Sequence, residues 1–456
     1  MDLRMQCLDR RLGELRALTT LFAAGPDPEI VDRATSATLD LPSLARCADA
    51  DALVAAFPAP DDPTAQAAIE ALRGRLDEVE ALESAGKYPE GLRLAATIAD
   101  DAARIDWPPV HAQALFWFGK LEARTGDAKA SAATLERAMQ RAAAARDDAL
   151  FLRAGTERVY VVGYDLGQPD EALQLGAVLD PLVTRAGDAP ADRATLLNLV
   201  GIVLWSKGAF AEAQDNLAKA LPLFIKARGP DHPDVAAVHI NLGNVLAEQG
   251  RHEEATQHYQ EALQISERIL GAQHPRTADA RENLGIVLRL QGKFPAAATN
   301  LEAALAVFET AYGADHMKVA EAVNELGNLY DALGEPARAL PYFQRAVTIG
   351  DARLPPDHPG RSTFRLGLGT ALLGLGRAAE ATVPLELARS IQARATTGNP
   401  IEVANVQLAL ARALWDARGD RVRARELATA ARAAYAAAGE RTRKQLAASE
   451  TWLGSR

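Results

Sequence analysis

The chain of 456 residues has few cysteines, few aromatic residues and no long apolar run. Cys7 and Cys47 lie in no CxxC or His-paired spacing, so we expect two small apolar side chains and neither a metal site nor a disulfide. Aromatic residues make up 5% of the chain, which suits close packing of helices rich in alanine and leucine. No stretch approaches the roughly 18 apolar residues of a membrane span. The charged N-terminus lacks the apolar centre of a signal peptide, so we expect a soluble, cytoplasmic protein.

Positive charge is also in short supply. The 50 basic residues are outnumbered by 60 acidic ones, a formal charge of −10 that argues against a general nucleic-acid binder. The sequence contains no Walker A motif, nucleophile elbow or H-E-x-x-H, and none of the kinase motifs V-A-I-K, H-R-D and D-F-G. We therefore predict a protein that is not an enzyme and uses no cofactor or metal.

What the sequence does contain is a unit of 42 residues that recurs in a fixed register, seen best over 231–270. Four separate columns keep this step, which chance does not produce, so the unit is a tandem repeat of one supersecondary element. The recurring positions are Gly201, Gly243, Gly285, Gly327 and Gly369; Gly208, Gly250, Gly292, Gly334 and Gly376; Ala213, Ala255, Ala297, Ala339 and Ala381; and His232, His274, His316 and His358.

Each unit is a pair of helices with a glycine at the turn between them. Apolar residues fall on one stripe of each helix, and the spacing of the turn glycines predicts about nine pairs in an all-α solenoid. A second glycine sits in the middle of the first helix, where it costs about 1 kcal/mol relative to alanine; we predict that two helix backbones approach closely there. The turn glycines are Gly86, Gly126, Gly167, Gly208, Gly250, Gly292, Gly334, Gly376 and Gly419.

The ends of the chain depart from the repeat. We expect a small helical segment over 1–57, with helices over 2–24 (Leu8, Leu12, Leu15, Leu18 and Phe22 on one stripe) and from an N-cap at Asp27 to about Leu39, then a loop and short helix. A capping helix is expected over 440–455. The predicted divisions are 1–57, a proline-rich junction at 58–63, degenerate repeats over 64–190, regular repeats over 191–395, and a last repeat with its cap over 396–456.

The repeat resembles tetratricopeptide repeats of the kinesin-light-chain type. The resemblance rests on N-L-G in the first helix, the turn glycine, E-A-x-x-x-Y-x-x-A-L in the second helix and a G-x-x-H-P loop, as in NLGNVLAEQGRHEEATQHYQEAL over 241–263. It implies a right-handed superhelix whose first helices line a concave groove. Separately, 1–57 is similar to the segment that joins kinase to repeats in bacterial tetratricopeptide serine/threonine kinases, which implies a sensor or docking role in such a system.

The resemblance also implies which residues line the groove, through four offsets from the mid-helix glycine that share one helix face. Asparagines there can bond a peptide backbone, and four acids against one arginine favour a basic or polar partner segment. The alternative is that these are merely exposed polar residues on a structural spacer or self-association scaffold. The groove candidates are Asn198, Trp205, Asn244, Asp279, Glu282, Arg289, Glu321, Asn324, Asn328 and Asp331.

Two further patterns have simpler interpretations. The four recurring histidines would lie about 10 Å apart in stacked pairs, too far to share one metal ion, so we interpret His-Pro as shaping the loop before each unit. The run from Gly374 to Ala379 matches a loose dinucleotide fingerprint, but that motif needs a preceding strand. Neither pattern predicts a ligand.

Overall fold

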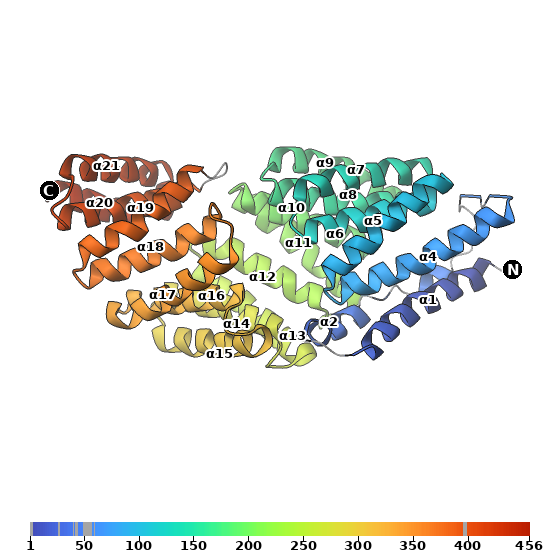
Figure 1. Ribbon diagram of the computed structural model, residues 1–456, viewed down its shortest axis with the longest axis horizontal. Helices are drawn as coiled ribbons and strands as arrows, with labels where there is room; N and C mark the ends of the chain where they lie inside the picture. Colours follow the sequence, from blue (N-terminus) through green and yellow to red (C-terminus); the bar gives the residue numbers. More distant parts are fainter. Residues whose placement is uncertain are drawn as a thin grey trace. The chain divides into compact units, whose positions relative to one another are not determined.

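The computed structural model describes residues 3–25, 28–39, 41, 44–48, 57–58, 60–394 and 399–456. All regular structure in these residues is helical (Figure 1), which confirms the predicted all-α class. The chain divides into two compact units, residues 1–245 and 246–456, and each is described by itself. No described helix is long and apolar enough to cross a membrane.

From Pro63 to Ala437 the described helices follow one another as nine pairs, the number predicted from the turn glycines. The pairs are α4 (Pro63–Ser84) and α5 (Tyr88–Ile105), α6 (Pro108–Arg124) and α7 (Ala128–Ala144), α8 (Asp148–Tyr160) and α9 (Pro169–Arg185), α10 (Pro190–Ser206) and α11 (Phe210–Arg228), α12 (Pro233–Glu248) and α13 (His252–Leu270), α14 (Pro275–Leu290) and α15 (Phe294–Tyr312), α16 (Met317–Ala332) and α17 (Pro336–Arg353), α18 (Pro359–Gly374) and α19 (Ala378–Arg394), and α20 (Pro400–Asp416) and α21 (Arg421–Ala437).

The turns within the pairs use left-handed backbone. Gly292 has φ 75° and Gly334 has φ 73°, a conformation that costs glycine nothing and other residues energy. The last pair is different, because Arg418 (φ 59°) takes the left-handed position there and Gly419 does not. The predicted turn at Gly419 is therefore present, but shifted by one residue.

The recurring histidines cap the first helices. Nδ1 of His274 accepts a hydrogen bond from the backbone N–H of Arg276 at 3.1 Å, and thus satisfies one of the donors left open at a helix start. His316 does the same for Lys318 at 3.2 Å although no proline follows it. The histidines therefore shape the start of each unit, as interpreted from the sequence.

The mid-helix glycines lie under side chains of the second helix. A Cβ on Gly285 would lie 2.7 Å from Leu301 Cγ and 3.3 Å from the carbonyl oxygen of Ala297. At Gly327 the nearest atoms belong to the ring of Phe343, at 2.7 Å. The predicted close approach is confirmed, but the nearest atoms belong to a packed side chain, with the backbone slightly further away.

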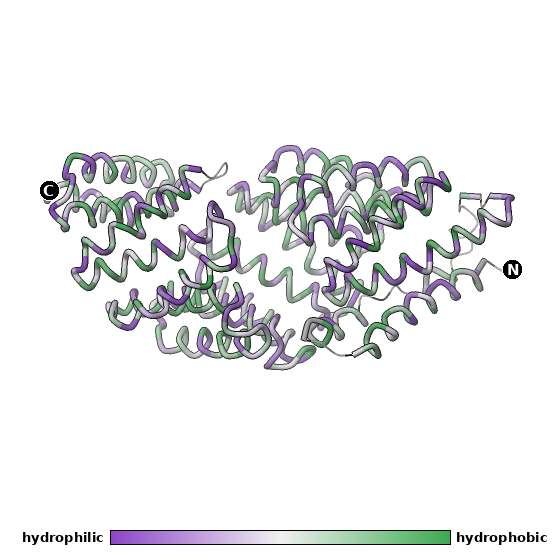
Figure 2. The backbone as a smooth tube through the Cα atoms, viewed as in Figure 1, coloured by the Kyte–Doolittle hydropathy of each residue, from purple (hydrophilic) through white to green (hydrophobic). Residues whose placement is uncertain are grey.

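First helices of successive pairs also pack against one another. In unit 1 these are α4, α6, α8 and α10, and in unit 2 they are α14, α16, α18 and α20. We call each set the first-helix layer of its unit. Hydrophobic and hydrophilic segments are mixed along the helices (Figure 2), because one stripe of a helix enters the core and another faces solvent. The layers matter for function because all the predicted groove residues except Asn244, which lies on α12, are on their helices.

The two ends agree with the sequence in outline. The first 57 residues contain α1 (Leu3–Ala23), α2 (Pro28–Leu39) and the short helix η1 (Leu44–Ala48), while Asp27 lies outside the described residues. On α1, Leu18 is buried but Leu8, Leu12 and Leu15 are exposed. At the other end η3 (Gly439–Thr442) leads into α22 (Arg443–Gly454), which buries Trp452 edge-on to Trp415 at 5.8 Å between ring centroids.

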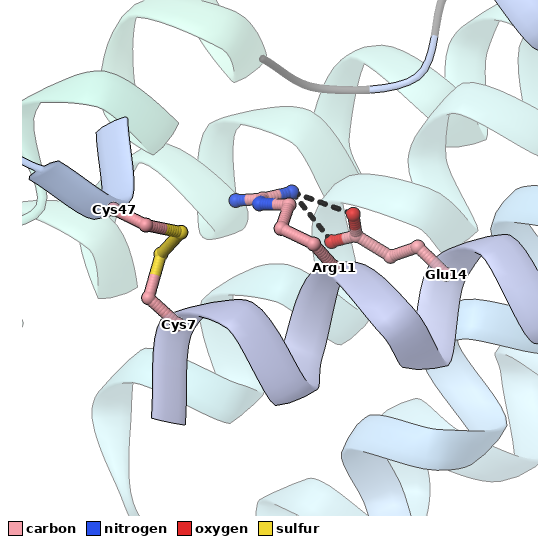
Figure 3. The surroundings of a disulfide bond; sticks show 4 residues. All are labelled: Cys7, Arg11, Glu14 and Cys47. Atoms are coloured by element: carbon pink, nitrogen blue, oxygen red, sulfur yellow. Dashed lines mark hydrogen bonds and ion pairs between the residues drawn. A yellow bond between two sulfur atoms is a disulfide. The ribbon is translucent and has the colours of Figure 1, made fainter. Parts of the chain in front are cut away.

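The expectation for the cysteines was wrong. Cys7 on α1 and Cys47 on η1 form a disulfide, with their Cα atoms 5.5 Å apart (Figure 3). The helices α1 and η1 contact each other, so the fold of this segment brings together two thiols 40 residues apart. Sequence spacing alone does not reveal such a pairing.

Candidate functional site

The predicted groove residues fall into two groups, one in each unit. Asn198 and Trp205 lie on α10 and Asn244 on α12, in unit 1. The other seven lie on two neighbouring helices of unit 2: Asp279, Glu282 and Arg289 on α14, and Glu321, Asn324, Asn328 and Asp331 on α16. Each group has its own geometry.

The group in unit 1 belongs to a small hollow of about 180 Å³. We call it the aromatic–amide pocket and define it by Tyr160, Tyr164, Trp205, Asn241 and Asn244, which line it together with three aliphatic side chains. Its lining residues come from α8 and the π-helical turn that follows it, and from α10, α11 and α12. Of the predicted residues, Trp205 and Asn244 line the pocket.

Three aromatic rings form a ladder in this pocket. Tyr160 and Tyr164 stack with centroids 5.3 Å apart, and Tyr164 and Trp205 stack with centroids 6.5 Å apart. Burial raises the pKa of Tyr160 to about 12, so its phenol is neutral at physiological pH. Trp205 Nε1 is buried and has no hydrogen-bond partner, although buried indole N–H groups normally find one. The pocket thus offers a flat apolar surface and an unused donor.

A turn of π-helix positions Tyr164. The element η2 (Val161–Asp165) continues α8, and the carbonyl of Val161 accepts a hydrogen bond from the N–H of Leu166, five residues on, at 2.9 Å. This wider turn, a feature often found at functional sites, keeps Tyr164 in a stack with Tyr160 while it reaches Trp205. Asn198, from the predicted set, supports the pocket from outside because its Oδ1 accepts from Asn241 Nδ2 at 3.0 Å.

The group in unit 2 forms a charged network between α14 and α16. Lys318 Nζ lies 2.9 Å from Asp279 Oδ1 and 3.4 Å from Glu321 Oε2. Burial acts to lower the pKa of Lys318, but these two carboxylates outweigh it and raise that pKa. The ammonium is therefore charged and bridges the two helices.

The carboxylate of Glu325 accepts hydrogen bonds from three of the predicted residues. Glu325 receives Arg289 Nη2 at 3.2 Å, and its Oε1 accepts from the side-chain amides of Asn324 at 3.3 Å and Asn328 at 3.0 Å. Asp331, the last of the predicted residues, is exposed at the end of α16. The predicted residues of unit 2 are thus brought together, but partly engaged with one another.

Glu282 lies in the middle of this network and is only 8% exposed. Burial raises its pKa to about 8, and the nearby carboxylates Glu321 and Asp279 add to the shift while Lys318 opposes it. Glu282 is therefore mostly protonated at neutral pH. The face carries less negative charge than the sequence count of four acids against one arginine indicated, because one acid is neutral and a lysine was overlooked.

The sequence analysis missed Tyr160, Tyr164, Asn241, Lys318 and Glu325. The two tyrosines lie in the degenerate repeats, where no offsets were applied; their spacing of four residues in an aromatic-poor chain was a usable signal. Lys318 lies three residues before Glu321 on the same helix face. The offsets began at Glu321, so they did not include Lys318. Asn241 and Glu325 lie beside that face and carried no signal.

In the described part of the chain no group of three or more His, Cys, Asp or Glu side chains could hold a metal ion. The Gly374–Ala379 run forms the end of α18, a turn and the start of α19, which is a helical setting and not the strand–helix setting of a dinucleotide site. Both groups are suited to binding by contact.

Comparison with known proteins identifies the repeat. Residues 192–268, 234–310 and 289–352 match the family model described as Tetratricopeptide repeat. These parts of the chain therefore carry tetratricopeptide repeats. No curated protein matches the chain.

Several solved structures share the helical fold. A Rap protein complexed with competence and sporulation factor is 17% identical, with a TM-score of 0.54 over 85% of this chain and 99% of that one. Aspartyl phosphate phosphatase F from Bacillus subtilis is 14% identical, with a TM-score of 0.51 over 83% and 96%. The repeats of a putative kinesin light chain from Podosopora anserina are 23% identical, with a TM-score of 0.38 over 46% and 99%. The first two likenesses show that the chain shares a helical-repeat fold with these proteins, and its residues 192–352 carry tetratricopeptide repeats.

Proposed function

We propose that the protein is a non-enzymatic scaffold that binds an extended segment of a partner protein along its first-helix layers. The observation that carries this proposal is the aromatic–amide pocket of unit 1, where Tyr164 and Trp205 stack beside the amides of Asn241 and Asn244. Such a pocket can hold one side chain of a peptide while amides bond its backbone.

The chemistry of the pocket fits this use. A flat or apolar side chain gains contact area on the exposed ring of Tyr164, and aromatic pairs add about 0.5–1.5 kcal/mol beyond the area that they bury. Trp205 Nε1 is buried at the pocket without a hydrogen-bond partner, so a peptide carbonyl that reached it would satisfy this donor. Asparagine amides both donate and accept, so they can bond both groups of a peptide unit. Rigid aromatic anchors of this kind dominate binding energies at interfaces.

The fold supports the same proposal. Tetratricopeptide repeats cover 192–352, and a Rap protein of similar fold has been solved with competence and sporulation factor bound. Stacked helix pairs create extended surfaces that suit long, narrow partners. We therefore place the partner on the first helices and not on the second ones.

We further propose that the partner belongs to a bacterial serine/threonine kinase signalling system. The support is the similarity of 1–57 to the segment between kinase and repeats in such proteins. Affinity capture with the full chain, followed by mass spectrometry, should return a kinase with H-R-D and D-F-G motifs. Capture of other partners only would remove this part of the proposal.

A cytoplasmic location belongs to the same proposal. Disulfides are rare in that compartment, so the redox state of Cys7 and Cys47 in freshly lysed, alkylated cells tests it. The disulfide in the structure counts against that location. Free thiols in the cell would support it, whereas a fully formed bond would favour an oxidising compartment.

Self-association is the alternative function, and one observation favours it. Leu8, Leu12 and Leu15 form an exposed apolar stripe on α1, of the kind that a second copy of the chain could cover. Light scattering of the full chain and of a Leu12→Glu variant distinguishes the two functions. An oligomer of the full chain that dissociates in the Leu12→Glu variant would support self-association.

Peptide selection tests the main proposal. A random 12-residue display library would be selected on the full chain, and the selected peptides would then be measured on a Trp205→Ala, Asn244→Ala variant. We expect sequences with a shared aromatic or apolar anchor that lose binding to the variant. Selected peptides that bind both proteins equally would contradict the pocket assignment.

A further inference from the structure

We infer that the first-helix layer of unit 2 binds an arginine side chain of the partner between α14 and α16, with Glu282 and Asn324 accepting its N–H groups. This inference rests on the proposed function, because it names the chemistry that a bound segment presents to unit 2. It concerns a site separate from the aromatic–amide pocket.

Two buried acceptors without partners mark the site. Glu282 is 8% exposed and Asn324 is 5% exposed, and neither Glu282 Oε1 nor Asn324 Oδ1 has a hydrogen-bond partner. Leaving such a group unpaired costs about 1–3 kcal/mol, so buried polar atoms are rarely unpaired without a reason. Asn324 Oδ1 can only accept, and the Glu282 carboxyl accepts at both oxygens once it is ionised, so a ligand that serves both groups is a donor. Arg289 Nε of the same network is also buried without a partner.

The two acceptors occupy equivalent places in the repeat. Glu282 and Asn324 are 42 residues apart, one repeat step, on α14 and α16. These helices pack against each other, at the usual separation of about 8–10 Å between axes. A guanidinium carries five N–H donors in a planar fork and can serve two acceptors at once. A lysine ammonium is more compact and more strongly hydrated, and fits such a divided site less well.

The surrounding charge favours a cation. Carboxylates of Asp279, Glu321 and Glu325 lie close enough to affect Glu282. Of the two cations nearby, Lys318 is held by Asp279 and Glu321, and Arg289 is held by Glu325. Each resident cation thus already has its own carboxylate. Ionised Glu282 has no cation of its own. The guanidinium of a bound arginine would supply that positive charge.

Binding should therefore release a proton. The free site holds Glu282 protonated, since burial raises its pKa to about 8, and a guanidinium beside the carboxyl favours the ionised form. The charged groups acting on Glu282 are Asp279 from its own helix and Lys318, Glu321 and Glu325 from α16. Of the other helices packed on α14, α13 places Glu267 against Arg281, and α15 places Glu302 near the hydroxyl of Tyr330.

The test uses N-acetyl-argininamide as the probe and N-acetyl-citrullinamide, a neutral molecule of the same shape, as its control. The full chain is labelled with ¹³C at glutamate side-chain carboxyls, and the Glu282 signal is assigned by its loss in Glu282→Gln. At pH 7 the arginine compound should move this signal to the position of a carboxylate, with release of about 0.9 proton per site for a pKa of about 8. The citrulline compound should leave it in place.

The pH dependence provides a second measurement. Because only ionised Glu282 pairs with the guanidinium, affinity should rise about tenfold per pH unit below pH 8 and level off above it. Glu282→Gln should bind more weakly at high pH and show no such rise, and gives a folded comparison because glutamine has the shape of the protonated acid. Glu380→Gln, an exposed position on α19, should behave as wild type.

The outcomes separate this inference from the proposed function. If saturating arginine compound leaves the Glu282 signal unmoved, the arginine site is wrong, whatever happens in unit 1. If the signal moves equally with citrulline, the charge-based recognition is wrong. Display peptides that depend on Trp205 test the proposed function independently, so either can fail alone.

Discussion

The rings of Tyr164 and Trp205 stack with their centroids 6.5 Å apart and their planes inclined by 20°. Tyr164 is supplied by the π-helical turn after α8 and Trp205 by α10, the first helix of the next pair. The stack therefore joins two successive repeats on the first-helix layer of unit 1, and it is 44% exposed at Tyr164. A partner segment can rest on it without any rearrangement of the core.

Replacing Tyr164 by alanine should weaken peptide binding while leaving the fold intact. An aromatic anchor at an interface is worth about 2 kcal/mol, or roughly thirtyfold in affinity. The exposed ring contributes less to folding. Binding of a selected peptide, measured by calorimetry, would show this loss. Val178→Ala, an exposed position on α9 of the same unit, is the matched control and should bind normally.

Replacing a helical glycine by alanine should have opposite effects on stability at two positions, Gly327 and Gly74. In Gly327→Ala the new Cβ would lie 2.7 Å from the Phe343 ring, and overpacking of this kind costs about 1–3 kcal/mol. A Cβ on Gly74 of α4 meets nothing within 4 Å, so Gly74→Ala should stabilise its helix by about 1 kcal/mol. Thermal unfolding followed by circular dichroism should show a lower midpoint for the first variant and a higher one for the second. Stabilisation by both would show that Gly327 is not a packing site.

Burial of Glu282 predicts that stability falls as the pH rises. Between about pH 4.5, its ordinary pKa, and about pH 8, its pKa in the fold, the folded chain keeps a proton that the unfolded chain has lost. Over that window the free energy of unfolding decreases with pH. Glu282→Gln should match wild type near pH 5 and exceed it above pH 8 by on the order of 2–4 kcal/mol.

Comparing the two proteins at each pH isolates Glu282. Asp77, whose pKa burial raises to about 7, contributes a decrease of the same sign between its ordinary value of 3.8 and that pH. It does so equally in both proteins and cancels. Parallel stability curves for wild type and variant would show that Glu282 is not protonated in the fold.

The disulfide should stabilise the N-terminal segment alone. A disulfide that closes a loop of 40 residues lowers the entropy of the unfolded chain. In the chain-entropy description this stabilises the folded state by about 4 kcal/mol. Cys7→Ser should therefore make residues 1–57 more sensitive to limited proteolysis, with no change in fragments from the repeats. Reduction of wild type should reproduce the effect, and reduction of Cys7→Ser should add nothing. Equal sensitivity of all three would contradict the role of this bond.

Much of the fold could be predicted from the sequence because the spacing of the recurring residues gives the length of the repeat. A glycine at the turn of each pair and a histidine before the first helices α12, α14, α16 and α18 are local requirements, met by residues such as Gly292 and His274. Each recurs every 42 residues, so one unit predicts its neighbours. The pairing of Cys7 with Cys47 depends on how α1 meets η1, and no periodic signal records that contact.

The candidate site could be predicted only in part for the same reason. The offsets implied by the resemblance selected Trp205 on α10, Asn244 on α12 and Glu282 on α14. The protonation of Glu282 depends on burial between helices, which a helix face drawn from sequence does not show. Tyr164 reaches the pocket through a π-helical turn, a departure from regular helix that residue spacing does not reveal.

Paired variants on the two helix layers test the central claim most directly. A Tyr164→Ala, Trp205→Ala variant alters the first-helix layer of unit 1, and a Val178→Ala, Gln174→Ala variant alters the second helix α9 of that unit. Binding of one selected peptide to both would be measured by calorimetry. Binding through the first-helix layer predicts a loss of thirtyfold or more, roughly 2 kcal/mol, for the first variant and wild-type affinity for the second. The reverse result, or equal losses, would contradict the proposal that the first helices hold the partner.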